Sequence, residues 1–273
     1  MVKETKSNLS WSLMRYIYLA VTVLIFGGGL NLSAADKETN NPWHSIPLVK
    51  GGKVSSDWAQ VGWGKFVADG KMIRSEPDER GIGLLVYTRE KLGNCQIRTV
   101  FKGKTPRSNS GFYIRIDDGI LDWTKKESPA VSRDDNGKMS EEMVTKLKGI
   151  ADSEAGPWYA VHHGYEVQIM DAAGAHGTGS IYSLADAAPL PEKSEDGWRT
   201  MVITLNGSKV MVDIDGKRVS SFDSEAKVTR AKRNWTEPKL DTKRPEVGYI
   251  GLQTHDPEDI VWFKEVSVRP LGK

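Results

Sequence analysis

Short runs in which apolar and polar residues alternate, separated by tight-turn signals, most strongly limit the fold of this 273-residue chain. In the clearest case, Met201–Leu205 and Lys209–Ile214 flank Asn206-Gly207-Ser208, and Asp215-Gly216 then leads into Lys217–Phe222. Side chains alternate across a strand with a period of two, and these turn residues accept the positive φ that tight hairpins need. The pattern therefore predicts meandering antiparallel hairpins.

The same signals recur along most of the chain. Phe66–Ile73 surrounds an Asp-Gly turn, and Cys95–Lys102 alternates as a half-buried strand does. Val247–Gln253 and Ile260–Val268 are the last two candidates. Many short strands with a single inserted helix predict an all-β fold, a two-sheet antiparallel jelly-roll sandwich.

The inserted helix is expected within a long insertion, residues 117–163. Ser140 can cap it, and an apolar face follows, made of Met143, Val144, Leu147, Ile150 and Ala151. Such a short amphipathic helix must pack against the sandwich, so we expect the insertion to cover or border the functional site rather than to form a separate domain. A surface loop without function is the alternative. A second, basic insertion, Glu225–Arg244, carries Lys227, Arg230, Lys232 and Arg233 and is expected to be a solvated loop.

The N-terminus has the three parts of a signal peptide. A basic head precedes the apolar run Ile17–Phe26, and Ser33 and Ala35 occupy the −3 and −1 positions of a cut before Asp36. The sequence thus predicts a signal peptide over 1–35, a linker over 36–44 and one domain over 45–273. An uncleaved anchor is the alternative, and Met14 is an alternative start. The expected location is secreted or periplasmic, without stable membrane insertion after cleavage.

Charge and cysteine content exclude some functions. The full chain carries a formal +2, and the signal segment removes three cations and one anion, so the mature chain is neutral. A neutral chain lacks the basic field that nucleic acid binding needs. The single cysteine, Cys95, has no partner for an internal disulfide and is expected to be a small buried group.

Three predicted strands carry polar residues in alternation with apolar ones. In the first strand, polar Tyr113 and Arg115 alternate with Phe112, Ile114 and Ile116. In the second, Glu166 and Gln168 alternate with Tyr165, Val167 and Ile169. In the third, Gln253 and His255 alternate with Leu252 and Thr254. Strict alternation places each polar set on one face of its strand. If the strands are neighbours, Arg115, Glu166, Gln168, Gln253 and His255 converge on one sheet face.

A solvated outer face would also explain this pattern. However, an ordinary outer face is rich in Lys, Thr, Ser and Glu, whereas this one offers long or planar groups with directional hydrogen bonds. A sugar needs such an array together with an aromatic ring for its apolar face. Trp158, Tyr159 and Tyr182 are the candidates for that ring.

Other chemistries have weaker signals. Ser110 lacks the second glycine of a hydrolase elbow. His162, His163, Glu166 and His255 could bind a divalent metal, although their spacing matches no established motif, and no cofactor is expected. His162 and His163 would point apart if they lay in a strand.

Six segments, in order, resemble the secreted bacterial 3-keto-disaccharide hydrolases, which are related in fold to concanavalin-like glucanases. They are Asn109–Arg115, Tyr165–Asp171, Thr178–Tyr182, Gly197-Trp198, Ile250–His255 and Val261–Val266, within Ser45–Leu271. The resemblance implies a jelly roll and glycosidic cleavage in sugars oxidised at C3. The chain departs from the family in the long gap between Arg115 and Glu166, and in having Trp198-Arg199 where Trp-Asn is common.

A C3 ketone makes the C2 proton acidic, so a base can form an enolate that expels the C1 substituent, after which water adds back. We expect His255 or Glu166 as the base, Arg115 as the enolate stabiliser, and Gln168 and Gln253 as hydroxyl ligands. Further substrate contacts are expected from Asp171, Tyr113, Tyr182 and Trp158. A two-carboxylate glycosidase using Glu166 and Asp171 is less favoured, because their positions differ in parity.

Two other classes of protein would share this fold and polar face. One is a carbohydrate-binding module that performs no catalysis. The other is a structural domain of the cell surface. Release of a free monosaccharide from an oxidised disaccharide distinguishes the enzyme from the binding module.

Overall fold

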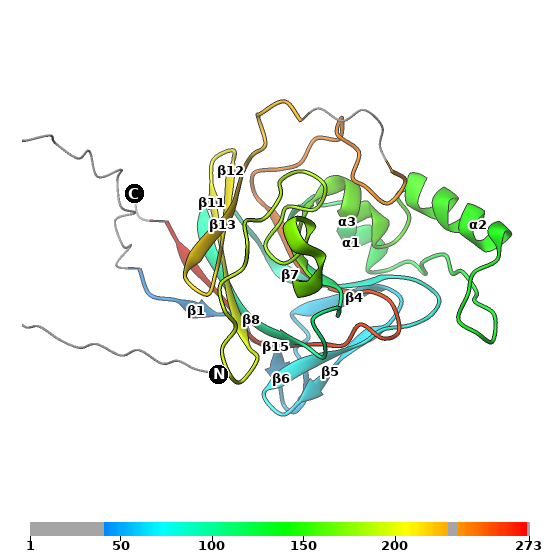
Figure 1. Cartoon of the computed structure of the whole chain (residues 1–273), viewed down its shortest axis with the longest axis horizontal. Coiled ribbons are helices and arrows are strands. Elements are labelled where there is room, and N and C mark those ends of the chain that lie inside the picture. The colour runs from blue at the N-terminus through cyan, green and yellow to red at the C-terminus, as the bar shows by residue number, and fades with distance from the viewer. Residues whose placement is uncertain (1–40, 229–233, 272–273) are drawn as a thin grey trace, which may run out of the picture. The chain divides into compact units, whose positions relative to one another are not determined.

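The fold is described from a computed structural model, for residues 41–228 and 234–271. Two antiparallel sheets form a sandwich, as predicted (Figure 1). The larger sheet has the order β13 (Lys217–Asp223), β12 (Lys209–Ile214), β11 (Arg199–Asn206), β8 (Cys95–Gly103), β15 (Val261–Pro270), β6 (Met72–Glu76), β5 (Lys65–Asp69), and β1 (His44–Ser45) also pairs with β15.

The smaller sheet carries the polar strands noted in the sequence. Its order is β10 (Tyr165–Ile169), β9 (Ser110–Ile116), β14 (Gly248–Thr254), β7 (Gly83–Leu92), β4 (Trp58–Gly62). A separate hairpin joins β2 (Val49–Lys50) to β3 (Lys53–Val54). The three polar strands β10, β9 and β14 are therefore neighbours, as the sequence argument required.

The predicted hairpins are confirmed. β11, β12 and β13 form a meander, and β5 pairs with β6 across the Asp69–Met72 turn. At the β12–β13 turn, Asp215 and Gly216 have φ of 50° and 80°, the positive values that a tight hairpin of this type requires.

The insertion after β9 contains three helices rather than the single one expected. These are α1 (Ile120–Trp123), α2 (Glu141–Asp152) and α3 (Trp158–His163), and a 3₁₀ segment, η1 (Asp171–His176), follows β10. The predicted start of α2 is confirmed, because the Ser140 side chain accepts a hydrogen bond from the backbone N–H of Met143. Among these described residues, no helix is long and apolar enough to cross a membrane.

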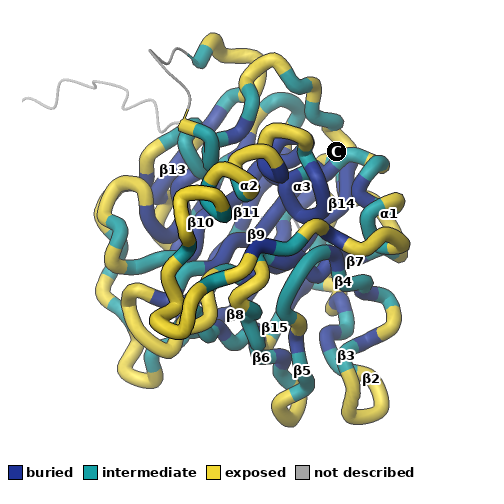
Figure 2. Tube along the Cα trace, turned by 90° about the vertical axis from the view of Figure 1, so that its right-hand side faces the viewer, coloured by how far each residue is buried: buried dark blue, intermediate teal, exposed yellow. Residues whose placement is uncertain are grey.

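The smaller sheet is covered on both faces. One face packs against the larger sheet through a core that includes Phe112, Ile114 and Leu252. The opposite face, with Tyr113 and Ile116, packs against a second apolar cluster that includes residues of α2 and α3. Every residue of β9, β10 and β14 is therefore buried (Figure 2). The helices therefore cover much of the sheet face on which the sequence predicted the polar side chains to converge.

Candidate functional site

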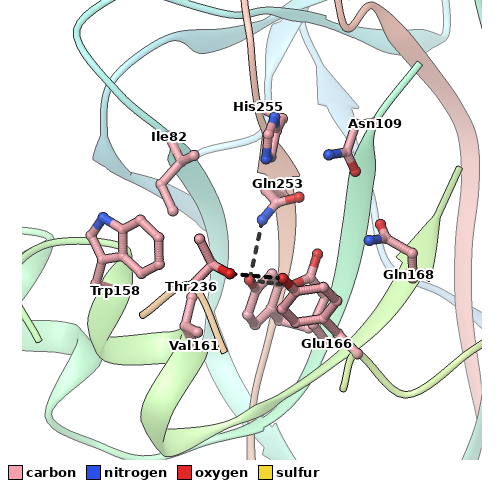
Figure 3. A pocket seen from close by; sticks show the side chains of 11 residues that line it. Ile82, Asn109, Trp158, Val161, Glu166, Gln168, Thr236, Gln253 and His255 are labelled. Carbon is pink, nitrogen blue, oxygen red and sulfur yellow. Dashed lines mark hydrogen bonds between the residues drawn. The ribbon is translucent and has the colours of Figure 1, made fainter. Parts of the chain in front are cut away.

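A cavity of about 110 Å³ lies between the smaller sheet and the segments that cover it. Figure 3 shows Trp158 and Ile82 on one side of it and Asn109 and Gln168 on the other. The lining residues are Ile82, Asn109, Tyr113, Trp158, Val161, Glu166, Gln168, Tyr182, Thr236, Gln253 and His255. The sequence prediction therefore found seven of them, and the structure brings these seven together.

Strand register explains the convergence. Glu166 lies opposite Tyr113 in the β10–β9 pair, and Tyr113 lies opposite Gly251 in the β9–β14 pair. Gln253 is two residues beyond Gly251, so its side chain points to the same face. Gly111 makes room for the carboxylate, because a Cβ there would lie 2.4 Å from Glu166 Oε1.

Glu166 is the central acidic group of the pocket. It is only 9% exposed, and desolvation raises the pKa of its carboxyl to about 7 against the lowering effect of Tyr113, His255 and Gln253. The Tyr113 hydroxyl donates to Glu166 Oε2 at 2.7 Å and accepts from Gln253 Nε2 at 3.2 Å. A carboxyl with such a pKa can accept or donate a proton near neutral pH.

His255 is the cationic group of the pocket. Its Nδ1 lies 3.4 Å from an Asp256 oxygen and 3.3 Å from an Asp259 oxygen. Burial disfavours the charged imidazole, but the two carboxylates outweigh burial and raise the pKa of His255 to about 9. The imidazole is therefore protonated at neutral pH, when Glu166 is partly ionised.

The same three side chains form a cluster of potential metal ligands. In the described part of the chain, His255, Asp256 and Asp259 are the one group of three or more His, Cys, Asp or Glu residues whose ligand atoms all lie within 4.8 Å of one another. His255 Nδ1 also lacks a well-aligned hydrogen bond. The set suits either an imidazolium held by two carboxylates or a divalent cation.

Two amide side chains offer open acceptors to the pocket. Gln253 is 5% exposed, and its Oε1 has no hydrogen-bond partner among the described residues. Asn109 Oδ1 is likewise buried without a partner in the described chain. Buried acceptors of this kind favour a ligand that brings hydroxyl donors.

The insertion supplies the apolar wall. Trp158 and Val161 of α3 line the pocket, so the insertion borders the site. The ring of Trp158 packs against Trp235 at 5.8 Å between centroids. Tyr182 also lines the pocket and its hydroxyl lies 3.3 Å from Thr236 Oγ1, whereas Tyr159 lies outside the pocket lining and bonds Asp117 Oδ1.

The second insertion is not simply a solvated loop. Lys239 Nζ donates to Glu154 Oε1 at 2.6 Å, and Arg244 Nε donates to the Gly164 carbonyl at 2.6 Å. Thr236 reaches the pocket itself. Of the four basic residues that suggested a solvated loop, Arg230, Lys232 and Arg233 lie outside the described residues.

Arg115 is placed away from the pocket, so the shared face expected for it is wrong. Its φ is 52°, and β14 shifts register beside it, so that Ile114 and Arg115 together oppose Ile250. This bulge reverses the alternation after Tyr113. The guanidinium, 2% exposed, donates from Nη2 to the Gly207 carbonyl in the β11–β12 turn.

Asp171 is also outside the pocket lining. Thr178 Oγ1 donates to its Oδ1 at 2.7 Å, and Lys193 Nζ and Arg199 Nε contact its Oδ2 at 2.9 and 3.0 Å. These contacts tie the segment after β10 to β11. The expected substrate contact, and the pairing of Asp171 with Glu166 in a two-carboxylate site, therefore lose their geometric basis.

His162 and His163 lie on α3 rather than in a strand, and both make contacts within the covering segments. His162 is fully buried, and its Nε2 and Nδ1 contact the Ala151 carbonyl and the Lys239 backbone N–H at 3.0 and 3.1 Å. His163 Nε2 contacts Glu154 Oε2 at 2.7 Å. These contacts leave neither histidine in the pocket.

Four lining residues were not among the predicted site residues: Ile82, Asn109, Val161 and Thr236. Ile82 precedes β7, and Thr236 belongs to the distant basic insertion, so neither carries a local signal. Asn109 directly precedes strand β9 and is the first residue of the Asn109–Arg115 motif, which was the one usable clue to its role.

Comparison with known proteins places the chain in a family. The model of the 3-keto-alpha-glucoside-1,2-lyase-like domain matches residues 44–269. The chain therefore belongs to this carbohydrate-related family, as the six motifs predicted. No functionally curated protein matches the sequence significantly.

Solved structures share the fold. One candidate glycosyl hydrolase from Parabacteroides distasonis ATCC 8503 is 19% identical with a TM-score of 0.55, over 85% of this chain and 100% of that chain. A second from the same organism is 14% identical with a TM-score of 0.51, over 81% of this chain and 91% of that one. At these identities the likeness shows a common fold.

Proposed function

We propose that this protein cleaves the glycosidic bond of 3-keto glycosides by base-assisted elimination across C1 and C2. The observation that carries the proposal is the pairing of a buried carboxyl, whose pKa is about 7, with a protonated imidazole in one pocket. The family description, which names a 1,2-lyase, supports the same chemistry.

Glu166 is the base in this mechanism. The C3 ketone acidifies the C2 proton, and the ionised carboxylate removes it, leaving the electron pair in an enolate across C2, C3 and the ketone oxygen. Tyr113 holds Glu166 Oε2, so the other oxygen, Oε1, is the one that takes the proton.

His255 is the acid that assists departure of the C1 substituent. The enolate electrons re-form the C3 carbonyl and create the C1–C2 double bond as the C1–O bond breaks. The departing oxygen takes a proton from the imidazolium, which leaves Glu166 protonated and His255 neutral. Exchange with solvent resets both groups, and addition of water to the double bond would complete a net hydrolysis.

The remaining lining residues suit recognition of a single sugar ring. A water needs about 10 to 15 Å³ of such space, so a cavity of about 110 Å³ takes roughly as many heavy atoms as one monosaccharide. Gln168, Gln253 and Asn109 would bind hydroxyls, and Trp158 and Tyr182 would pack on the apolar face of the ring.

The test is product formation from a 3-keto disaccharide. We expect release of the free monosaccharide with an ultraviolet-absorbing enone, and loss of deuterium from substrate labelled at C2. Glu166→Gln should abolish release while ligand binding persists, and Glu265→Gln on the other sheet is the control. Binding of oxidised sugars without any product would instead identify a carbohydrate-binding module.

Export is part of the proposal. The signal-like segment over 1–35, which lies outside the described residues, supports a secreted or periplasmic location. A glycoside-cleaving enzyme placed there would meet substrates from the surroundings of the cell.

A further inference from the structure

A second, larger cleft opens beside the pocket. Its volume is about 770 Å³, several times that of the pocket. It is lined by Glu79, Asn109, Arg133, Asp134, Asp135, Asn136, Gly137, Met170, Asp256, Pro257, Glu258 and Asp259. Residues 133–137 belong to the long insertion, so the insertion builds one wall of the cleft.

The cleft adjoins the pocket. Asn109 lines both, and its backbone N–H donates to Asp259 Oδ1 at 2.9 Å. His255 lines the pocket, while Asp256 and Asp259, the two carboxylates that face its Nδ1, line the cleft. A ligand whose ring fills the pocket and that extends beyond Asn109 would therefore meet the lining of the cleft.

The lining of the cleft is strongly acidic. It includes six carboxylates (Glu79, Asp134, Asp135, Asp256, Glu258 and Asp259) and, among the described residues that line it, a single cation, Arg133. Arg133 Nη2 already donates to Asp256 Oδ1 at 2.7 Å. The field inside the cleft therefore remains negative.

We infer that this cleft holds the leaving group of the substrate and selects leaving groups that are neutral or carry an amine, such as an amino sugar, over anionic ones such as a uronic acid. The inference rests on the proposed function, in which the C1 substituent departs from a ring held in the pocket. The cleft meets the pocket at Asn109 and beside His255, because Asp256 and Asp259 of the cleft lining face His255 Nδ1.

A further cleft, beside Tyr182, does not meet this requirement. Besides Tyr182 it is lined by His176, Ser183, Leu184, Asp186, Val228 and Glu237. None of these residues forms a hydrogen bond or ion pair with His255 in the described structure. Proximity to the proposed acid therefore distinguishes the two clefts.

Three substrates with the same 3-keto glucosyl ring test the inference: their leaving groups are glucosamine, glucose and glucuronate. At low ionic strength kcat/KM should be greatest for the amine and least for the carboxylate, with a ratio on the order of tenfold or more that shrinks as salt screens the cleft. Combining Glu79→Gln with Asp135→Asn should reduce that ratio several-fold. Glu141→Gln with Glu142→Gln, on exposed α2 and outside both linings, is the matched control.

Binding measurements separate this inference from the proposed function. Calorimetric Kd values for the three unoxidised disaccharides should follow the same order and respond to the same variants, even if no 3-keto substrate is cleaved. Equal Kd and kcat/KM values across the series, or tighter binding of the glucuronate, would overturn the assignment of the cleft. Failure of cleavage with the expected order of Kd values would overturn the proposed function alone.

Discussion

Replacing Tyr113 with phenylalanine removes one oxygen atom from the centre of the pocket. That hydroxyl donates to Glu166 Oε2 at 2.7 Å and accepts from Gln253 Nε2 at 3.2 Å. Tyr113 is fully buried, so water cannot easily take the place of the lost donor. The lost hydrogen bond stabilises the ionised carboxylate of Glu166 much more than the neutral acid. Its removal therefore raises the pKa of Glu166.

The size of the change follows from the strength of that bond. A hydrogen bond to a charged group contributes about 1.5 to 3 kcal/mol, and 1.36 kcal/mol corresponds to one pH unit. The pKa of Glu166, about 7 in the parent, should therefore rise by about one to two units. At pH 7 the ionised fraction would fall from about one half to between about 1% and 10%, a loss of five- to fifty-fold in kcat/KM.

The assay is the pH dependence of kcat/KM on a 3-keto disaccharide. The parent should give a bell whose acidic limb reports Glu166 near pH 7 and whose basic limb reports His255 near pH 9. In the variant only the acidic limb should move, toward higher pH. Tyr249→Phe, in the same sheet but outside the pocket lining, is the control. An unmoved acidic limb in a folded Tyr113→Phe variant would refute the role of Tyr113 in tuning Glu166.

Four further outcomes are expected. The pKa of Glu166 is raised from 4.5 to about 7, so the protonated carboxyl stabilises the fold fully below pH 4.5 and this stabilisation is lost as pH rises through 7. Relative to Glu166→Gln, the parent should therefore lose about 3 kcal/mol of unfolding free energy between pH 4 and 9. A difference in unfolding free energy between the two proteins that stays constant with pH would contradict the burial of Glu166. Gly111→Ala displaces the Glu166 carboxylate and should lower kcat/KM at least about tenfold, unlike Gly149→Ala, where a Cβ meets nothing within 4 Å. A folded Arg115→Met variant should keep kcat/KM within about twofold of the parent value and should keep the parent pH profile, because Arg115 lies outside the pocket. A large loss of kcat alone would instead indicate that Arg115 acts in the reaction. N-terminal sequencing of exported protein should begin within a few residues of Asp36, and retention of residues 1–35 would contradict cleavage there.

The predictable part of this molecule is the part governed by local rules. Alternation with period two placed Glu166, Gln168, Gln253 and His255 on one face, and the strand pairing β10-β9-β14 makes them neighbours. The hairpin turns were equally local, because Asp215-Gly216 carries its conformational preference in its own two residues. The six motifs then identified the family that the comparison confirms.

Arg115 shows where the local rules stop. Alternation placed it beside Tyr113, but one residue in the left-handed region inserts a bulge and turns its side chain toward the other sheet. A non-glycine residue rarely adopts this conformation, and the sequence gives no turn signal there. The partner carbonyl, on Gly207, is 92 residues away, so the contact that settles the conformation could not be seen locally.

The first insertion was expected at the site, but the part that the second insertion plays in covering the pocket was hidden for a related reason. Trp158 packs on Trp235, and Lys239 pairs with Glu154, so two insertions far apart in sequence enclose the site together. In the sequence, the first insertion shows one amphipathic helix and the second shows a basic loop, with no local signal that the two pack together. Only their mutual packing explains why Thr236 joins the lining and why the polar sheet face is buried.

Cys95, the only cysteine in the chain, makes the protein convenient for site-specific labelling. It lies buried at the start of β8, and burial raises the pKa of its thiol to about 12. Because thiolates rather than thiols react with maleimides and disulfide reagents, the native chain should remain unmodified near neutral pH. A cysteine introduced at exposed Asn136, on the rim of the acidic cleft, would then carry a fluorophore alone and report directly when a ligand enters.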